Sequence, residues 1–476
     1  MKRPEYISQI QMSKMSYDKL LCPLRMRESK KKNTVSDLRT EFERDYHRII
    51  GSASFRRLQD KTQVFALDKS DFVRTRLTHS LEVSSFAKSL GQTTGNMLCE
   101  KGVISGQQAR DMSDILLCAG LIHDIGNPPF GHFGEMVIRD WYKKNLRGMY
   151  FSGKPVTELI SPLQEADLYC FEGNAQSLRV VAKLHHLVND NGMNLTMGVL
   201  NTIIKYPVSS SQIDKSAGDI RFKKMGYFQA DKELFETVTG ATGAFSYRHP
   251  LTFLLEAADD IAYSTADIED GFKKGILSYQ ALSKLLEEGE GGRAAYERLE
   301  TLYKRALDNG EYDPESYAVQ NWVISMQSRL IQAASESFVE HQEEILDGAF
   351  GREVLEGTDC EALIKLLKKI SYEHIFQTPS IVRSEIAADT IISRLMDKLV
   401  PAAILYDTRE ERGAAQKKLM QIVSRNYLRH YSLMAREATD GDKLYLRLVL
   451  VNDFIAGMTD SYAKALYQEL TGVSSS

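Results

Sequence analysis

The strongest constraint on the fold lies in the stretch Leu116–Glu135, which reads LLCAGLIHDIGNPPFGHFGE. It begins as an apolar run with small residues, which predicts a buried helix, and it breaks at a glycine followed by Pro128-Pro129. The pair His123 and Asp124 closes the apolar helix. Burying a charge is costly unless it has a partner or a metal, so this pair predicts a compensating ligand at the helix end.

The His-Asp pair alone does not establish a site, because ordinary hydrogen bonds can satisfy a histidine at a helix end. Two other segments favour a metal. RTRLTHSLEVSSFAKSL places a histidine on a helix with an apolar face, and HPLTFLLEAADDIAYSTADIEDGF places an aspartate on a stripe that recurs every four residues. Two histidines and two carboxylates from three helices suit a hard or borderline divalent ion with positions open for water. The predicted ligands are His79, His123, Asp124 and Asp259.

Further ionisable residues flank this set at helical spacing. Arg76 lies one helical turn before His79, so both can face one cavity, although a surface ion pair is the competing interpretation. His132 and Glu135 lie three apart at the predicted start of the next helix, where the carboxylate can hold one imidazole nitrogen and fix its tautomer. Alternatively, Glu135 is simply an acidic residue that the helix dipole favours near an N-terminus.

Two lysines and one stripe give additional candidates. Lys205 lies in the apolar run IIKY, and Lys224 in RFKKMGYF is a similar but weaker case. Such a lysine can meet an anion, or its stem can follow the core while its head reaches water. Tyr263 and Asp267 stand one and two turns beyond Asp259 on the same stripe. A tyrosine there is more often core, but the neighbouring aspartates favour a polar stripe that faces a cavity.

Bulk composition is that of an ordinary soluble globular protein, with 26% charged and 43% hydrophobic residues. A net charge of −4 argues against a protein that coats nucleic acid over its whole surface, although a local basic groove stays open. The five cysteines are scattered without metal-type spacing, which indicates a reduced intracellular protein. No signal-type start or membrane-length apolar run is present, so we expect a cytoplasmic protein without a membrane partner.

Helical patterning from Asp37 onward and only 11 prolines predict an all-α bundle with at most short β hairpins. Gln63 and Val64 are expected on a loop or short strand before the helix that carries His79. We expect a polar N-terminal arm over 1–36, a catalytic core over 37–275 and a helical C-terminal region over 276–476 that completes the pocket, an oligomer interface or both. The arm holds a basic cluster, interpreted as solvated, with a nucleic-acid role as the alternative. Its members are Arg25, Arg27, Lys30, Lys31 and Lys32.

Seven blocks occur together in order from about Glu41 to the C-terminus: EFERDYHRII, SFRRLQDKTQVF, RTRLTHSLEV, LIHDIGNPPFGHFGE, FEGNAQSLRV, RHPLTFLLEAADDIAYS and DFIAGMTDSYA. With these blocks and the order H…HD…D, the chain resembles the HD-domain metal phosphohydrolases, and within them the deoxyguanosine triphosphate triphosphohydrolases (dGTPases). The resemblance implies an HD-type helical core and one divalent ion, with Mn²⁺ or Mg²⁺ favoured over Fe²⁺, Co²⁺, Zn²⁺ or Ni²⁺. It also implies a homo-oligomer such as a hexamer. Single-stranded DNA is kept separately as a possible partner.

The same resemblance assigns roles to individual residues. It implies that His132 and Glu135 are catalytic, and that Tyr263 packs where a ribonucleotide would carry its 2′ hydroxyl. A triphosphate carries about four negative charges, so its site needs several cations and amide donors. The expected substrate-binding residues are Gln63, Val64, Arg76, Asn174, Lys205, Tyr206, Lys224, Tyr263 and Asp267.

The function that the resemblance implies is metal-assisted hydrolysis of dGTP at the α-phosphorus, with deoxyguanosine and inorganic triphosphate as the expected products. Whether His132 activates water or protonates the departing 5′ oxygen is not decided by the sequence. One alternative is a broader dNTP triphosphohydrolase, and another is an HD enzyme that cleaves phosphodiesters or nucleotide monoesters. An alternative of another class is a single-stranded nucleic-acid-binding protein with a nucleotide effector pocket.

Overall fold

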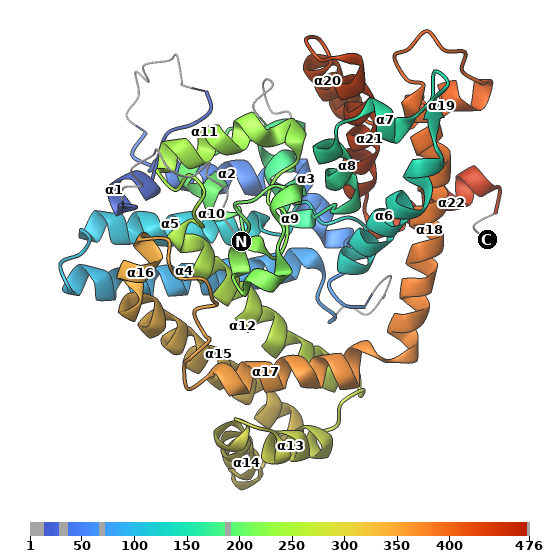
Figure 1. Ribbon diagram of the computed structural model, residues 1–476. Coiled ribbons are helices and arrows are strands. Elements are labelled where there is room, and N and C mark those ends of the chain that lie inside the picture. The colour runs from blue at the N-terminus through green and yellow to red at the C-terminus, as the bar shows by residue number, and fades with distance from the viewer. Residues whose placement is uncertain (1–13, 28–36, 66–71, 186–191, 474–476) are drawn as a thin grey trace.

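The computed structural model describes residues 14–27, 37–65, 72–185 and 192–473, in which nearly all regular secondary structure is helical (Figure 1). Within these residues the only sheet is an antiparallel hairpin of β1 (Tyr150–Phe151) and β2 (Lys154–Pro155). The predicted all-α fold with at most short β hairpins is therefore confirmed. Gln63 and Val64 lie in a loop before the first long helix.

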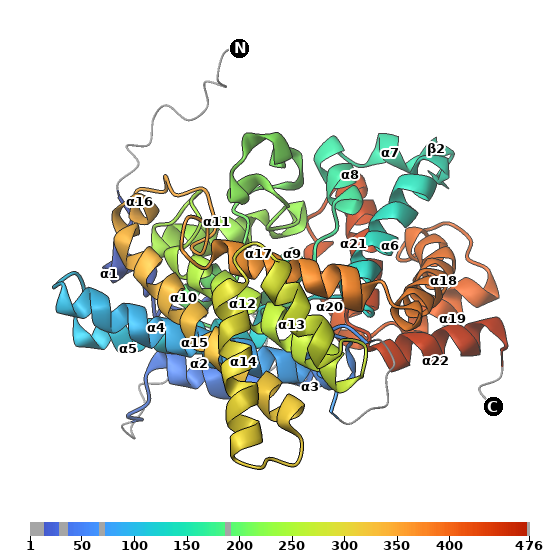
Figure 2. The same cartoon turned by 90° about the horizontal axis from the view of Figure 1, so that it is seen from below.

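Three long helices build the centre of the molecule: α4 (Arg76–Glu100), α5 (Gly106–Ile122) and α12 (Pro250–Lys273). Capping boxes at Thr75 and Ser105 start the first two, and Pro250 occupies the first turn of the third. The helices α4 and α5 lie side by side, and α12 packs against both (Figures 1 and 2). Gly120 permits this approach, because a Cβ there would lie 2.6 Å from the Cα of Ser84.

The segment after residue 275 packs onto this centre. Helix α15 (Pro314–Glu340) contacts both α4 and α12, and α14 (Arg293–Asp308) packs on α15 beside α13 (Tyr279–Glu288). Helix α17 (Glu361–Ile370) continues into the π-helix η9 (Ser371–Phe376), and both contact α12. The buried residues Trp322, Leu367 and Ile268 belong to the hydrophobic cluster that joins these elements.

The remaining wall is built from α6 (Gly131–Asn145), α18 (Pro379–Ile404), α21 (Asp440–Ala456) and α22 (Asp460–Thr471). Helix α18 packs against the other three (Figure 1). The C-terminal helices therefore meet the helix that begins directly after the His-Asp stretch.

The predicted polar arm over residues 1–36 is wrong for the described residues 14–27. Tyr17 and Leu20 in α1 (Tyr17–Leu20) are buried in the main core. The Arg25 side chain is only 9% exposed, because it pairs with Glu41 at 2.8 Å and with Asp45. Apolar burial and these ion pairs fix the segment to the core. Lys30, Lys31 and Lys32 lie outside the described residues.

Shorter elements complete the fold, and no described helix is long and apolar enough to cross a membrane. They are α2 (Glu41–Ile50), α3 (Ala53–Arg56), η2 (Arg57–Asp60), η3 (Leu146–Gly148), α7 (Val156–Leu159), α8 (Pro162–Tyr169), α9 (Gly173–Arg179), η4 (Val180–Leu184), α10 (Met197–Thr202), η5 (Ser210–Gln212), η6 (Lys215–Ala217), η7 (Ile220–Phe222), η8 (Gln229–Asp231), α11 (Lys232–Thr242), α16 (Gln342–Leu346), α19 (Ala414–Ile422) and α20 (Arg425–Met434).

Candidate active site

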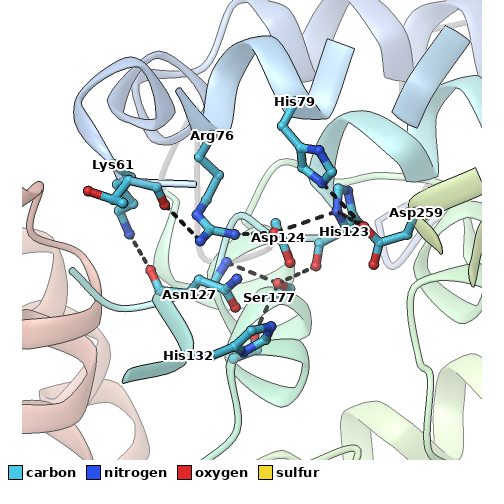
Figure 3. A network of polar contacts seen from close by, with 12 residues as sticks. Lys61, Arg76, His79, His123, Asp124, Asn127, His132, Ser177 and Asp259 are labelled. Atoms are coloured by element: carbon cyan, nitrogen blue, oxygen red, sulfur yellow. Dashed lines mark hydrogen bonds and ion pairs between the residues drawn. The ribbon is translucent and has the colours of Figure 1, made fainter. Parts of the chain in front are cut away.

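The four predicted metal ligands come together where α4, the end of α5 and α12 meet (Figure 3). Ligand atoms of His79, His123 and Asp124 lie within 4.8 Å of one another. Asp259 Oδ1 lies 3.2 Å from His79 Nε2 and 3.5 Å from His123 Nε2. Both histidines are almost completely buried. Residues separated by 180 positions along the chain thus form one cluster of nitrogen and oxygen donors.

The protonation pattern of His123 fits a metal ligand. Its Nδ1 lies 2.8 Å from the carbonyl oxygen of Gly120, which can only accept, so Nδ1 carries the proton. In the neutral imidazole, the form that binds a metal, the lone pair is then on Nε2, which is buried, has no hydrogen-bond partner among the described residues and faces the aspartates. A backbone carbonyl that orients the ligating imidazole is the usual support for a metal-bound histidine. The donor set therefore fits one divalent ion.

Two cations stand beside the carboxylates of this cluster. Arg76 pairs with Asp124 Oδ2, and Lys205 Nζ lies 3.0 Å from Asp259 Oδ2. Burial opposes ionisation of Asp124, but His123 and Arg76 outweigh it and hold its pKa below the ordinary value. Burial likewise disfavours the charged forms of Asp259 and Lys205, yet their mutual attraction lowers the pKa of Asp259 and raises that of Lys205. Both aspartates are therefore ionised and available as ligands.

His132 and Glu135 are the second and fifth residues of α6, near its predicted start. Glu135 is buried, and its Oε2 lies 3.4 Å from His132 Nδ1. Its Oε1 accepts a hydrogen bond of 3.0 Å from the Gly173 N–H. Gly173 must be glycine, because a Cβ there would lie 2.4 Å from Glu135 Oε1. Chiefly through its charge, Glu135 raises the pKa of His132. The pair is an imidazole held at one nitrogen by a fixed carboxylate.

A cavity of about 730 Å³ joins this pair to the metal cluster. A larger cavity of about 870 Å³, lined by residues of α11, α20 and α21, contains none of the predicted residues. The smaller cavity has the volume expected of a small-molecule site. Nine predicted residues line it: Gln63, Val64, Arg76, Asp124, His132, Asn174, Lys205, Asp259 and Tyr263.

Comparison with known proteins gives two matched domains and close relatives. Residues 76–195 match the HD domain, and residues 354–469 match the phosphohydrolase-associated domain. A deoxyguanosinetriphosphate triphosphohydrolase-like protein of Listeria monocytogenes is 48% identical over 469 residues, which cover 97% of this chain and all of the relative. A Klebsiella pneumoniae protein named deoxyguanosinetriphosphate triphosphohydrolase is 31% identical over 94% of this chain and 97% of its own. A Synechocystis relative, also named triphosphohydrolase-like, is 35% identical over 92% of this chain and 94% of its own.

The chain belongs to the deoxyguanosinetriphosphate triphosphohydrolase family. This confirms the resemblance drawn from the sequence blocks. The protein is a hydrolase, and its HD domain is of the metal-dependent phosphohydrolase type, in agreement with the donor cluster of His79, His123 and Asp124.

In this phosphohydrolase the other predicted residues lie behind the cavity wall or apart from it. His79, His123 and Glu135 are buried behind lining residues. Tyr206 and Asp267 are buried and do not line the cavity. Asp267 Oδ2 has no hydrogen-bond partner among the described residues, and burial with the nearby Asp270 charge raises the pKa of Asp267 well above its ordinary value.

Lys224 also lies outside the cavity lining. It contacts the site through Glu172, a residue that sequence reasoning did not single out. Lys224 Nζ lies 2.9 Å from Glu172 Oε2, and Asn174 donates to Glu172 Oε1 at 2.6 Å. The buried Glu172 carboxylate therefore connects Lys224 to a lining amide. Its place in the block FEGNAQSLRV, directly before the required glycine Gly173, was the available signal.

The individual residues of one cavity wall were not singled out from the sequence, although the C-terminal region that supplies them was expected to complete the pocket or an oligomer interface. This wall comes from α17, η9 and α18, and Lys368 Nζ there pairs with Asp260 Oδ2 at 2.8 Å. The ring of Phe376 lies 6.0 Å from that of Tyr263, centroid to centroid. Spacing of four between a lysine and two aromatic residues was the only signal in the sequence. The missed lining residues of this wall are Lys368, Tyr372, Phe376, Ile381, Ser384 and Glu385.

Proposed function

We propose that this protein hydrolyses dGTP at the α-phosphorus and releases deoxyguanosine and inorganic triphosphate. One observation carries the proposal. A single cavity of about 730 Å³ is lined by the two aspartates of a divalent-ion donor set, by a carboxylate-held imidazole and by three cations, and the two histidines of the donor set lie behind its wall. The relatives named for this activity cover nearly the whole chain. The donor set is His79, His123, Asp124 and Asp259, and we propose Mn²⁺ or Mg²⁺ as the ion. When bound, the ion supplies positive charge at the α-phosphate and an acidified water.

The phosphate end of the site is formed by Arg76, Lys205 and Lys368. Each cation stands beside an aspartate at the cavity wall, with partners Asp124, Asp259 and Asp260. These pairs hold the cations in place, so little side-chain entropy is lost when phosphate oxygens bind. Positive charge placed in advance is the main way in which proteins stabilise phosphoryl transfer.

Proton transfer falls to His132. In the reaction a water oxygen bonds to the α-phosphorus, the bond from phosphorus to the 5′ oxygen breaks, and that oxygen gains a proton. Glu135 holds His132 Nδ1, which leaves Nε2 to face the cavity. Nε2 either takes the proton of the attacking water or donates one to the 5′ oxygen.

The products decide between the proposal and its alternatives. We would incubate the protein with Mn²⁺ and each of the four dNTPs and separate the products by chromatography. Inorganic triphosphate and deoxyguanosine from dGTP alone are expected. Equal release from all four would support a broad dNTP hydrolase. Orthophosphate as the first product would contradict attack at the α-phosphorus, and pyrophosphate with dGMP would contradict departure of the 5′ oxygen.

Tyr263 is proposed to exclude the 2′ hydroxyl of ribonucleotides. Its ring lines the cavity and is held against Phe376. Replacing Tyr263 by alanine should lower the kcat/KM preference for dGTP over GTP by about 10- to 100-fold, because the ring no longer occupies that volume. Tyr263→Phe is the matched control and should keep the preference. Competition kinetics with both nucleotides would measure it, and an unchanged preference in Tyr263→Ala would remove this role.

Glu385 on α18 is proposed to read the base. Guanine presents two neighbouring N–H donors on one edge, which a carboxylate can accept together, whereas adenine does not. Glu385 lines the cavity from α18, a helix far along the chain from those that carry the proposed metal ligands. We expect Glu385→Gln to reduce the preference for dGTP over dATP by about tenfold or more. Glu373→Gln changes an exposed residue of η9 and serves as the control. Identical preferences in the two variants would exclude Glu385 from base recognition.

A further inference from the structure

The junction between α21 and α22 reaches the active site although no described residue beyond Glu385 lines the cavity. Asp460 is the first residue of α22 and is only 2% exposed. Its Oδ2 accepts from the Thr62 N–H at 3.0 Å and from the Thr62 hydroxyl. Its Oδ1 accepts from the Phe130 N–H at 3.0 Å. One buried carboxylate thus joins two loops that are separated by 68 positions from each other and by more than 300 from Asp460.

Both loops carry residues of the site. Thr62 directly precedes Gln63 and Val64 in the cavity lining. Phe130 caps the N-terminus of α6, two residues before His132, and adopts a left-handed backbone with φ of 63°. A bulky residue pays a conformational penalty in that region, so surrounding contacts must hold it there. The bond from Phe130 N–H to Asp460 is such a contact.

Lys61 adds a second tie between the same segments (Figure 3). Its buried ammonium donates to the carbonyl of Asn127 at 2.5 Å and to that of Ala456 at 2.7 Å. Burial, with the Arg76 charge nearby, lowers the pKa of Lys61 to about 7. Residues 61–62, 127–130 and 456–460 are therefore connected twice, through a carboxylate and through an ammonium.

The tie continues to the metal cluster. The carbonyl of Thr62 accepts from Arg76 Nη2 at 2.8 Å, and Arg76 also pairs with Asp124 (Figure 3). Because Asp460 fixes the position of Thr62, it also helps to fix the position of the Arg76 guanidinium. Through its hydrogen bond with Phe130, the same carboxylate also helps to fix the start of α6, the helix that carries His132.

We infer that Asp460 is a positioning residue for the reaction. From the phosphohydrolase-associated domain it sets the Thr62 loop and the Phe130 loop at a fixed separation, so that Arg76 and His132 face one substrate. This inference rests on the proposed function. A misplacement of about 1 Å between such groups lowers a rate by about 100-fold.

Asp460→Asn tests the inference in the full-length protein. The amide keeps the shape but has only one acceptor oxygen, so it cannot accept from both loops. We expect kcat for dGTP with Mn²⁺ to fall about 10- to 100-fold, with a smaller change in KM, while the Kd for Mn²⁺ from calorimetry stays within about twofold. Asp442→Asn is the matched control, because it removes an acid from the first turn of α21 that contacts Gln164 and does not line the site cavity. It should leave kcat unchanged.

Amide hydrogen exchange gives a readout that needs no substrate. In Asp460→Asn, peptides that cover 61–65 and 127–131 should exchange at least about tenfold faster, while the α15 peptides stay unchanged. If the wild-type protein leaves dGTP intact, the proposed function fails, and exchange still decides whether Asp460 holds both loops. Unchanged exchange, wild-type kcat, or a kcat loss equal to that of Asp442→Asn would overturn the inference.

A second variant covers the case in which Asp460→Asn does not fold. Thr62→Val removes one hydroxyl bond to Asp460 and keeps the side-chain shape and the backbone N–H. We expect kcat to fall by about two- to tenfold, the loss of one hydrogen bond, with Mn²⁺ affinity unchanged. A wild-type kcat in Thr62→Val would likewise overturn the inference.

Discussion

Replacing His123 by alanine is expected to remove divalent-ion binding and to lower dGTP turnover by at least about a thousandfold. His123 Nε2 faces both Asp124 and Asp259 at 3.5–3.6 Å, so its loss takes a nitrogen donor from the middle of the cluster. The two aspartates then keep their cation partners, Arg76 and Lys205, which neutralise them without a metal, and His79 stays as the one nitrogen donor of the set. Calorimetry with Mn²⁺ and chromatography of the nucleotide products would measure both losses.

Two further variants separate this effect from damage to the fold. His47→Ala alters an exposed histidine of α2 and should retain Mn²⁺ binding and turnover. Asp259→Asn keeps the volume of the side chain, removes the charge and should lose turnover as His123→Ala does. Circular dichroism would confirm that each variant is folded. Wild-type turnover or wild-type Mn²⁺ affinity in His123→Ala would contradict the proposed metal site.

Replacing His132 by alanine is expected to lower kcat by about 100- to 10,000-fold while Mn²⁺ affinity is retained. The reason for this contrast is geometric, because His132 lines the cavity from α6, whereas the ion would be held from α4, α5 and α12. Turnover kinetics and Mn²⁺ calorimetry on the same preparation would show the lower kcat beside an unchanged Mn²⁺ affinity. A kcat equal to that of the wild-type protein would remove His132 from the mechanism.

The pH dependence of kcat reports which proton transfer His132 performs. Glu135 raises the pKa of His132, so the protonated imidazole persists to higher pH than usual. If His132 acts as the base, kcat falls as pH drops through the raised pKa; if it acts as the acid, kcat falls as pH rises through it. Glu135→Gln removes the negative charge and lowers that pKa, so the limb should move to lower pH in either case. A pH profile of kcat that is unchanged in Glu135→Gln would show that Glu135 does not set the pKa of His132.

Some site residues could be predicted from the sequence because the residues next to them in the chain form a recognisable helical pattern. The apolar run of α5 ends in His123 and Asp124, and the four-residue stripe of α12 carries Asp259, so local periodicity predicted both helices and the face of each donor. The block order from RTRLTHSLEV to DFIAGMTDSYA supplied the family. The same periodicity placed Asp267 with Asp259 and Tyr263, but in the folded chain Asp267 does not reach the cavity wall.

Other residues depend on partners that lie far away in the chain. Lys368, Tyr372 and Glu385 belong to amphipathic segments without a motif, and they enter the site only because α17 packs on α12 and α18 packs on α6. Asp460 sits in a recognised block, yet its sequence does not say that its two oxygens hold Thr62 and Phe130. Arg25 looked like part of a solvated basic cluster, but Glu41 and Asp45 bury it.

By itself the sequence determined the helical class and the family and predicted the residues of the proposed donor set, because helix periodicity, breaks and residue chemistry are local properties. Only the tertiary structure decided which polar side chains share the cavity and which residues position them. The physical reason is that a helix fixes the face on which a side chain stands, whereas the element packed against that face is chosen by long-range burial of apolar surface.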